Sequence, residues 1–246
     1  MLSIIFYLYS ALIVIVFFLL SVVALVVCAP FDRSRRVVHE LSRALCMCFW
    51  YAPLSWRRRI EGLENVRRDE RYVIVLNHNS MADIISLYFV PLNFRWVSKR
   101  EVFRIPFIGG FLLLHGDIAI ERGRGAESMH KVINDGKKWL SRGASVAMFP
   151  EGTRSKDGEI HRFKQGAFAL AKEAGVAILP VVLDGTTSVL KKNKLFNWHN
   201  CLTVRVLPPV PAEEVERAEM NDLIASVQSQ MCDALAQIRN TNAKNE

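Results

Sequence analysis

The sequence lacks several patterns that would assign it to a common class of enzyme. It contains no Gly-x-Ser-x-Gly elbow and no Gly-x-x-x-x-Gly-Lys-Ser/Thr loop, so a serine hydrolase and a P-loop enzyme have no support. It has no cluster of metal ligands at a usual spacing, so the residues give no support to a metal site. Internal repeats and low-complexity linkers are also missing, which favours a single globular domain.

Cysteine is scarce, and its spacing excludes a disulfide framework. The five cysteines form an odd set without regular spacing: Cys28, Cys46, Cys48, Cys201 and Cys232. Free thiols in a reducing compartment fit this pattern best.

Charge is missing from residues 1–31, where nearly every side chain is apolar. A membrane span needs about 20 such residues, so residues 1–29 are predicted to be a transmembrane anchor. A cleaved signal peptide is the alternative, but the run lacks a basic start and exceeds an h-region of about 7–15 residues. Arg33, Arg35 and Arg36 follow, so the positive-inside rule predicts a single-pass anchor with the remaining chain on the cytoplasmic face.

Residues 30–56 are predicted to hold an amphipathic helix at the membrane interface, capped by Ser34 and ending near Tyr51. Its apolar face has helical spacing, and His39 is expected on the polar side. Ten arginines oppose six acids between Asp32 and Arg71, within a chain of net charge +8, which suits anionic lipid headgroups. A core helix of the globular domain is the alternative.

Residues 57–246 alternate short β-rich runs with helical patterns. We expect strands at 71–76, 94–98, 117–121, 145–149, 177–183 and 202–207. We expect helices at 81–89, from 101 onward, and at 126–141, 165–174 and 211–239. This alternation predicts an α/β domain whose mostly parallel sheet is flanked by helices on both sides. Pro180, inside an apolar run, predicts an edge strand or a bulge.

His78 and Asp83 follow the first predicted buried strand. On one continuous helix their side chains would point apart, so they can meet only if His78 precedes the helix and Asp83 reaches back from its first turn. Ser80-x-x-Asp83 resembles a capping box and would place Asp83 there. In that geometry Asp83 orients the imidazole and His78 is a general base. Asp83 could instead serve only as a helix cap.

Arginine and lysine side chains follow other predicted strands. Arg154 lies in the loop Phe149–Ser155, Arg122 follows the run Ile118–Glu121, and Lys99 ends another strand. Because ligands of such sheets bind beyond the carboxyl ends of the strands, these cations are candidate phosphate ligands. A surface turn with a solvated arginine is the alternative for each loop.

Five segments, taken in order, resemble the four motif blocks of the glycerolipid acyltransferases, most closely the bacterial 1-acyl-sn-glycerol-3-phosphate acyltransferases. They are Asn77-His78-x4-Asp83, Lys99 with Pro106-x-x-Gly109, Gly116–Arg122, Phe149–Ser155 and Leu179-Pro180-Val181. The resemblance covers about residues 58–210.

This resemblance implies catalytic roles for His78 and Asp83, and a substrate-binding role for the following residues: Lys99, Arg122, Glu151, Gly152, Thr153 and Arg154. It implies transfer of an acyl group from acyl-CoA or acyl carrier protein to the sn-2 hydroxyl of lysophosphatidate, which yields phosphatidate for phospholipid biosynthesis. The expected partners are membrane lipids and these two substrates, and no nucleic acid.

Two other hypotheses stay open on the sequence alone. The same chemistry could act on glycerol-3-phosphate, another lysophospholipid or a lyso-aminolipid. Alternatively, the protein could be a non-catalytic membrane adaptor that binds anionic lipid through its arginine-rich segment.

Overall fold

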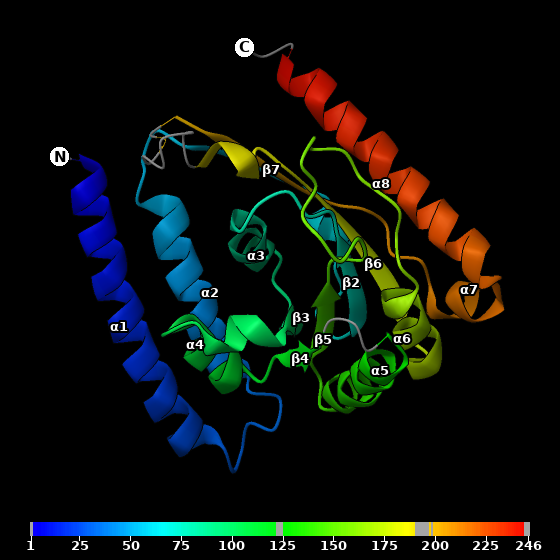
Figure 1. The fold of residues 1–246 in the computed structure, drawn as a ribbon, viewed down its shortest axis with the longest axis horizontal. Helices are drawn as coiled ribbons and strands as arrows, with labels where there is room; N and C mark the ends of the chain where they lie inside the picture. The colour runs from blue at the N-terminus through cyan, green and yellow to red at the C-terminus, as the bar shows by residue number, and fades with distance from the viewer. Residues whose placement is uncertain (1, 122–124, 190–196, 198, 244–246) are drawn as a thin grey trace.

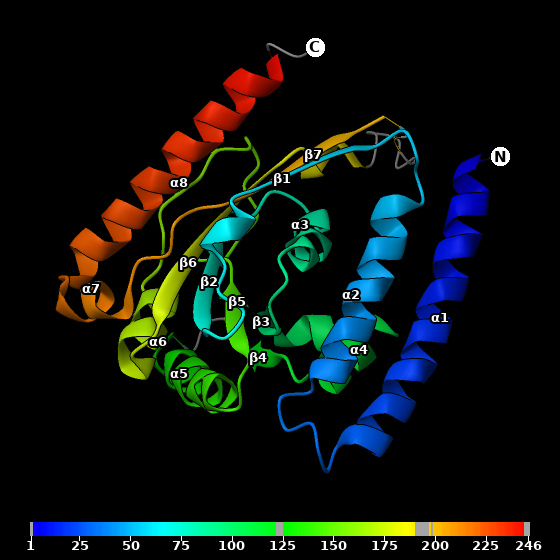
Figure 2. The same ribbon diagram turned by 180° about the vertical axis from the view of Figure 1, so that it is seen from behind.

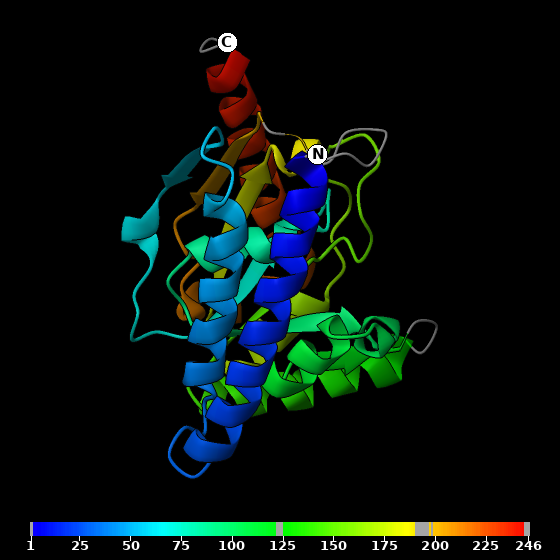
Figure 3. The same ribbon diagram turned by 90° about the vertical axis from the view of Figure 1, so that its left-hand side faces the viewer.

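The structure of the protein is a computed structural model that describes residues 2–121, 125–189, 197 and 199–243. The chain begins with two helices, α1 (Leu2–Cys28) and α2 (Arg36–Tyr51), which lie side by side as an antiparallel hairpin (Figure 3). One face of α1 is exposed along its length, for example at Ile4, Leu12 and Val23. Among the described helices, α1 alone is long and apolar enough to cross a membrane.

The chain after α2 forms a seven-stranded sheet of order β1-β7-β6-β2-β5-β3-β4. The strands are β1 (Arg57–Glu61), β2 (Tyr72–Leu76), β3 (Phe94–Lys99), β4 (Ile118–Ile120), β5 (Ser145–Met148), β6 (Ala177–Asp184) and β7 (Cys201–Val206). Neighbouring strands are parallel except for β6 and β7, which pair antiparallel. Every residue of β2 is buried, as expected for a parallel strand covered on both faces.

Helices cover both faces of the sheet. They are α3 (Ala82–Ser86), α4 (Ile108–His115), α5 (Gly125–Ser141), α6 (Gly166–Ala174), α7 (Ala212–Arg217) and α8 (Met220–Ala243), with short 3-10 turns η1 (Leu63–Asn65), η2 (Leu87–Phe89), η3 (Arg100–Arg104) and η4 (Thr186–Val189). Figures 1 and 2 show α1 to α4 on one side of the sheet and α5 to α8 on the other. Each side holds its own buried apolar cluster.

The predicted fold class is confirmed, and each predicted strand is present with ends shifted by a residue or two. The sequence analysis missed β1, whose residues Arg57–Glu61 carry four charges in five positions. This segment has little intrinsic preference for a strand. It becomes one by pairing in parallel with β7, from Arg57 opposite Cys201 to Glu61 opposite Arg205.

Two expectations for the segment 30–56 are wrong. Ser34 does not cap α2: its hydroxyl donates to Asp32, and the Asp32 carboxylate accepts the Val37 N–H at 2.8 Å in its place. His39, expected on a polar face, is fully buried. The helix has two packed sides, one against α1 and one against the domain, and Trp50 on the latter is also fully buried. On its domain side, α2 is therefore a core helix.

A buried polar chain fastens α2 to the domain. His39 Nδ1 lies 2.8 Å from His115 Nε2, and His115 Nδ1 lies 2.7 Å from Asp117 Oδ1. The Asp117 carboxylate also accepts the Trp96 N–H. An Arg95 guanidinium nitrogen lies 3.2 Å from His115 Nε2. Burial raises the pKa of Asp117 to about 7 and lowers the pKa of both histidines well below 6.5.

Pro180 lies in β6, an interior strand between β7 and β2, so the edge-strand alternative is wrong. The bulge alternative agrees with the pairing. Val181 lies opposite Val206, whereas Ile178 bridges to Val210, so the partner segment contains one extra residue. The interruption falls opposite Pro180, the position that cannot donate a ladder hydrogen bond.

Candidate active site

The strand ends that carry the candidate residues lie at one edge of the sheet. β2, β5, β3 and β4 are adjacent and parallel, so their carboxyl ends meet at the same edge. His78 follows β2, the loop 149–155 follows β5, and Lys99 is the last residue of β3. The predicted position of these segments beyond the strand ends is thus observed.

His78 and Asp83 are in contact. His78 Nδ1 lies 2.8 Å from Asp83 Oδ2, and the Asp83 side chain is fully buried. His78 precedes helix α3 and Asp83 is in its first turn, which is the geometry that the spacing required. The same Asp83 oxygen accepts the backbone N–H groups of Asn79 and Ser80, each at 2.7 Å. The carboxylate thus orients the imidazole and holds the turn before α3.

The capping box is only half formed. Asp83 accepts the Ser80 N–H as that motif requires, but the Ser80 hydroxyl accepts the N–H of Ala82 rather than that of Asp83. The Asp83 carboxylate therefore serves both as a helix-start acceptor and as the partner of His78. The two interpretations of Asp83 are compatible.

The hydrogen bond to Asp83 decides which nitrogen of His78 can act as a base. An ionised carboxylate only accepts hydrogen bonds, so Nδ1 must carry the proton and the neutral ring presents the lone pair of Nε2. The imidazole also stacks on Phe149 at 3.9 Å between ring centroids, and Phe149 stacks on Trp96 at 5.1 Å. The ring is thus restrained by a hydrogen bond and by a stacked neighbour.

Glu151 connects the loop after β5 to His78. Its Oε1 accepts the His78 backbone N–H at 3.0 Å, and its Oε2 accepts the His161 N–H at 3.1 Å. The Ser155 N–H donates to the His78 carbonyl at 2.7 Å. Burial raises the pKa of Glu151, and these two N–H donors oppose that effect. Glu151 therefore acts on the loop backbone around His78.

Gly152, Thr153 and Arg154 follow Glu151 in this loop. Gly152 has φ +73°, and a Cβ there would lie 2.7 Å from Lys164 Nζ, so glycine suits both the backbone and the space. Thr153 and Arg154 are exposed. Among the described residues, Arg154 has no hydrogen-bond or ion-pair partner, so its guanidinium is available to a ligand.

Lys99 is half-buried at the end of β3, next to the ion pair of Arg100 with Glu121 at 2.7 Å, which joins the ends of β3 and β4. Arg122 lies outside the described residues. The roles assigned from the sequence stay predictions: catalysis by His78 and Asp83, and substrate binding by Lys99, Arg122, Glu151, Gly152, Thr153 and Arg154.

The sequence reasoning assigned no role to Asn77 or Phe149, although both stand in the motifs. Both amide atoms of Asn77 bond the backbone of Leu183, at 2.9 and 2.8 Å, and so join the end of β2 to β6. The sequence signal for this strand-joining role of Asn77 is an amide that directly follows a buried strand and precedes the candidate base.

Beside the turn before α3 lies an apolar pocket of about 270 Å³, lined by Phe6, Tyr7, Phe49, Trp56, Ser80, Met81, Ala82, Ile85, Thr187 and Val189.

Known proteins resemble this chain in sequence and in fold. A family model described as Acyltransferase matches residues 57–184. A 1-acyl-sn-glycerol-3-phosphate acyltransferase of Chlamydomonas reinhardtii is 38% identical over 185 residues, 72% of this chain and 55% of that protein. The alpha form from Ovis aries is 32% identical over 89% of this chain and 76% of its own length. The chain thus spans about half the length of the first of these relatives.

The crystal structure of the 1-acyl-sn-glycerophosphate acyltransferase PlsC from Thermotoga maritima has a similar fold. It aligns with a TM-score of 0.69 over 95% of this chain and 98% of that one, at 20% identity. The alignment includes the N-terminal helices as well as the sheet, since nearly the whole of both chains is covered.

Proposed function

This chain belongs to the acyltransferase family, and from this premise we propose that it acylates the sn-2 hydroxyl of 1-acyl-sn-glycerol-3-phosphate to give phosphatidate. Relatives in an alga and in sheep carry the name of that activity. The observation that carries the proposal is the His78–Asp83 hydrogen bond of 2.8 Å, at the sheet edge that also bears Lys99 and Arg154.

His78 would act as general base through Nε2. The acceptor hydroxyl attacks the thioester carbonyl as its proton passes to Nε2, and the positive charge on the ring is stabilised by Asp83. The tetrahedral intermediate then expels the thiolate, which takes the proton back from His78. A thioester is already activated, so the reaction needs no protein nucleophile, and no metal or bound cofactor is expected.

Arg154 and Lys99 would hold the acceptor phosphate. Arginine offers a planar fork of donors for phosphate oxygens, and Arg154 has no competing partner among the described residues. Arg122 would join them. With the phosphate held, the free hydroxyl is confined near His78, which lowers the entropic part of the barrier. The apolar pocket beside Met81 suits part of an acyl chain.

The long acyl chains of substrate and product require access to a membrane, and α1 is suited to anchor the domain there. Arg33, Arg35 and Arg36 follow α1, which supports a cytoplasmic position for the catalytic domain. The thioester donor would be acyl-CoA or acyl carrier protein.

An acceptor panel with the purified full chain tests the proposal. Lysophosphatidate, glycerol-3-phosphate and neutral lysolipids would be compared with one acyl-CoA, and lysophosphatidate should give the highest kcat/KM. His78→Ala should lower turnover by about 10²–10⁴-fold while the protein still associates with vesicles. Unchanged turnover in this variant would exclude His78 as the base, and a preference for another acceptor would replace the proposed substrate.

A further inference from the structure

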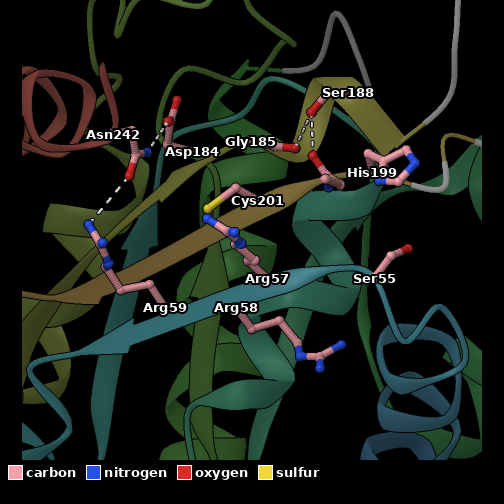
Figure 4. A pocket seen from close by; sticks show the side chains of 11 residues that line it. Ser55, Arg57, Arg58, Arg59, Asp184, Gly185, Ser188, His199, Cys201 and Asn242 are labelled. Atoms are coloured by element: carbon pink, nitrogen blue, oxygen red, sulfur yellow. Dashed lines mark hydrogen bonds between the residues drawn. The ribbon is translucent and has the colours of Figure 1, made fainter. Parts of the chain in front are cut away.

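A second polar pocket lies at the same sheet edge, on the other side of β2 from Lys99 and Arg154. Its volume is about 780 Å³, which falls within the range of cofactor and small-molecule sites. The lining comes from β1, β7, the end of β6, η4 and the last turn of α8 (Figure 4). We call it the Arg57 pocket.

Two arginines of β1 face into the Arg57 pocket. Strand alternation sends Arg57 and Arg59 to one side, toward Cys201 and Asn242, and Arg58 to the opposite side (Figure 4). Arg58 is engaged there, because it donates to the Trp50 carbonyl at 2.7 Å. All three arginines of β1 line the pocket together with the Asp184 carboxylate, and the guanidinium groups of Arg57 and Arg59 lie on its inner side.

These two guanidiniums have spare donors. Among the described residues, the Arg57 side chain makes no hydrogen bond or ion pair, and the Arg57 backbone N–H donates to the Asn200 carbonyl at 2.9 Å. Arg59 makes only long contacts, 3.4 Å to Asn242 Oδ1 and 3.7 Å to Glu61 Oε1. Glu61 has a closer partner in Arg205, at 2.7 Å. Each guanidinium carries five N–H donors, so most of them remain available to a ligand.

Asn200 supplies an independent sign of a missing ligand. It lines the pocket and is 9% exposed, and its side-chain oxygen accepts the Ser188 hydroxyl. Its Nδ2 is buried and has no hydrogen-bond partner among the described residues. A buried donor without an acceptor costs free energy that a bound oxyanion would recover.

Protection of a sheet edge does not account for these features together. Charged side chains on an edge strand such as β1 do discourage pairing with another chain. That role requires neither a concave site nor an unpaired amide donor on a neighbouring segment. Donors from Arg57, Arg59 and Asn200 around one cavity match a group with several oxygen acceptors, such as a phosphate.

The position of the pocket indicates which phosphate it holds. β1 runs parallel to β7, which is antiparallel to β6, so Arg57 at the start of β1 lies at the edge where β2 ends in His78. β1 is three strands from β2, roughly 15 Å at about 4.8 Å a strand. Lys99 and Arg154 lie on the other side of β2, so the two cationic sites flank His78.

We propose that the Arg57 pocket binds the phosphate groups of the thioester donor's carrier arm, while Lys99 and Arg154 hold the acceptor phosphate. The proposal rests on the proposed function, in which both substrates carry phosphate and meet at His78. A carrier arm separates its thioester from its phosphates by a long flexible chain, which suits a site some strands away. The size of the pocket suits a nucleotide-sized group better than a free phosphate ion.

Binding without turnover tests the pocket independently of the reaction. Adenosine 3′,5′-bisphosphate and 4′-phosphopantetheine would be titrated into the full chain in neutral detergent, and phosphatidylglycerol would be added as mixed micelles with the same detergent. Either soluble phosphate should bind, and it should slow maleimide labelling of Cys201, the exposed pocket residue opposite Arg57, as followed by peptide mass spectrometry. Tighter binding of adenosine 3′,5′-bisphosphate would indicate a nucleotide carrier, and tighter binding of 4′-phosphopantetheine would indicate a protein-bound arm.

Arg57→Gln with Arg59→Gln should weaken that binding by about tenfold or more and abolish the protection of Cys201. Asn200→Asp keeps the shape of the side chain but replaces the unpaired Nδ2 donor by an oxygen acceptor, so it should also weaken binding of the soluble phosphates. Arg68→Gln with Arg217→Gln, two exposed arginines outside the pocket, is the charge-matched control for the double variant.

Three outcomes overturn the proposal. Neither soluble phosphate binds, the arginine and asparagine variants bind the soluble phosphates as tightly as wild type, or the variants lose only their binding to phosphatidylglycerol. The last would make the pocket a lipid-headgroup site. Absence of acyl transfer to lysophosphatidate would contradict the proposed function but would not alter these binding data.

Discussion

The role of Asp83 can be separated into its charge and its hydrogen-bonding geometry by two substitutions. In the structure one oxygen, Oδ2, accepts three hydrogen bonds, from His78 Nδ1 and from the N–H groups of Asn79 and Ser80. The other oxygen, Oδ1, is buried without a described partner. An asparagine can therefore place its oxygen at the Oδ2 position, keep all three bonds, and turn its amide nitrogen toward the unpaired side.

Asp83→Asn should therefore preserve the tautomer of His78 and remove only the negative charge. A hydrogen bond to a charged group contributes about 1.5–3 kcal/mol and a neutral one about 0.5–1.5 kcal/mol. The difference, together with the lost attraction to a positively charged ring, predicts a fall in kcat of roughly 10- to 100-fold. The fold should persist, because the backbone donors of Asn79 and Ser80 keep their acceptor.

Asp83→Ala removes the acceptor itself. Three donors in a buried turn lose their partner, at about 1–3 kcal/mol each, so the free energy of unfolding should fall by at least about 3 kcal/mol. Its kcat should fall as far as that of His78→Ala. The assays are steady-state turnover with lysophosphatidate and acyl-CoA, and urea unfolding.

Two results would refute this reasoning. If Asp83→Asn is as inactive as His78→Ala, the asparagine has not kept the tautomer, and its oxygen does not replace Asp83 Oδ2 as the acceptor for His78 Nδ1. If Asp83→Asn has wild-type turnover, the charge of Asp83 does not assist the base, and its role is that of a helix-start acceptor only.

Arg154→Ala should raise the KM for a phosphorylated acceptor by about tenfold or more and change the KM for the thioester little; equal increases would contradict its assignment. Phe149→Leu should lower kcat by up to about tenfold, because a stacked ring pair contributes about 0.5–1.5 kcal/mol, and an unchanged kcat would show that the stack on His78 is passive. Asp117→Asn should alter the pH dependence of unfolding. Burial raises the pKa of Asp117 in the folded wild type, so the wild-type free energy of unfolding relative to that of the variant should fall as pH rises from 3.8 to about 7. A difference in unfolding free energy that does not change with pH would contradict that burial effect.

The alternation of apolar and polar residues was enough to predict the order of the strands and helices along the chain. Residues such as those of β2 form a strand because their side chains suit burial on both faces of a sheet. The five residues between His78 and Asp83 likewise restricted the pair to one geometry, and the structure has that geometry. These features depend on neighbours in the sequence, so local patterns predict them.

Pairing between distant segments was not predictable in the same way. Arg57–Glu61 is a strand only because β7 offers it hydrogen bonds. Pro180 fits an interior strand because the segment that follows β7 contains an extra residue opposite it. His39 is buried because α2 packs against both α1 and the domain, and the charge pattern of the helix alone does not show the second contact.

Local sequence predicts which residue types follow four of the strands: a histidine and an aspartate after one, and arginine or lysine after three others. Only the tertiary structure decided the sheet order, which sets β2 and His78 between Lys99 and Arg154 on one side and the Arg57 pocket on the other. The physical reason is that strand order follows from long-range packing and hydrogen bonding between segments far apart in the chain, which local periodicity does not encode.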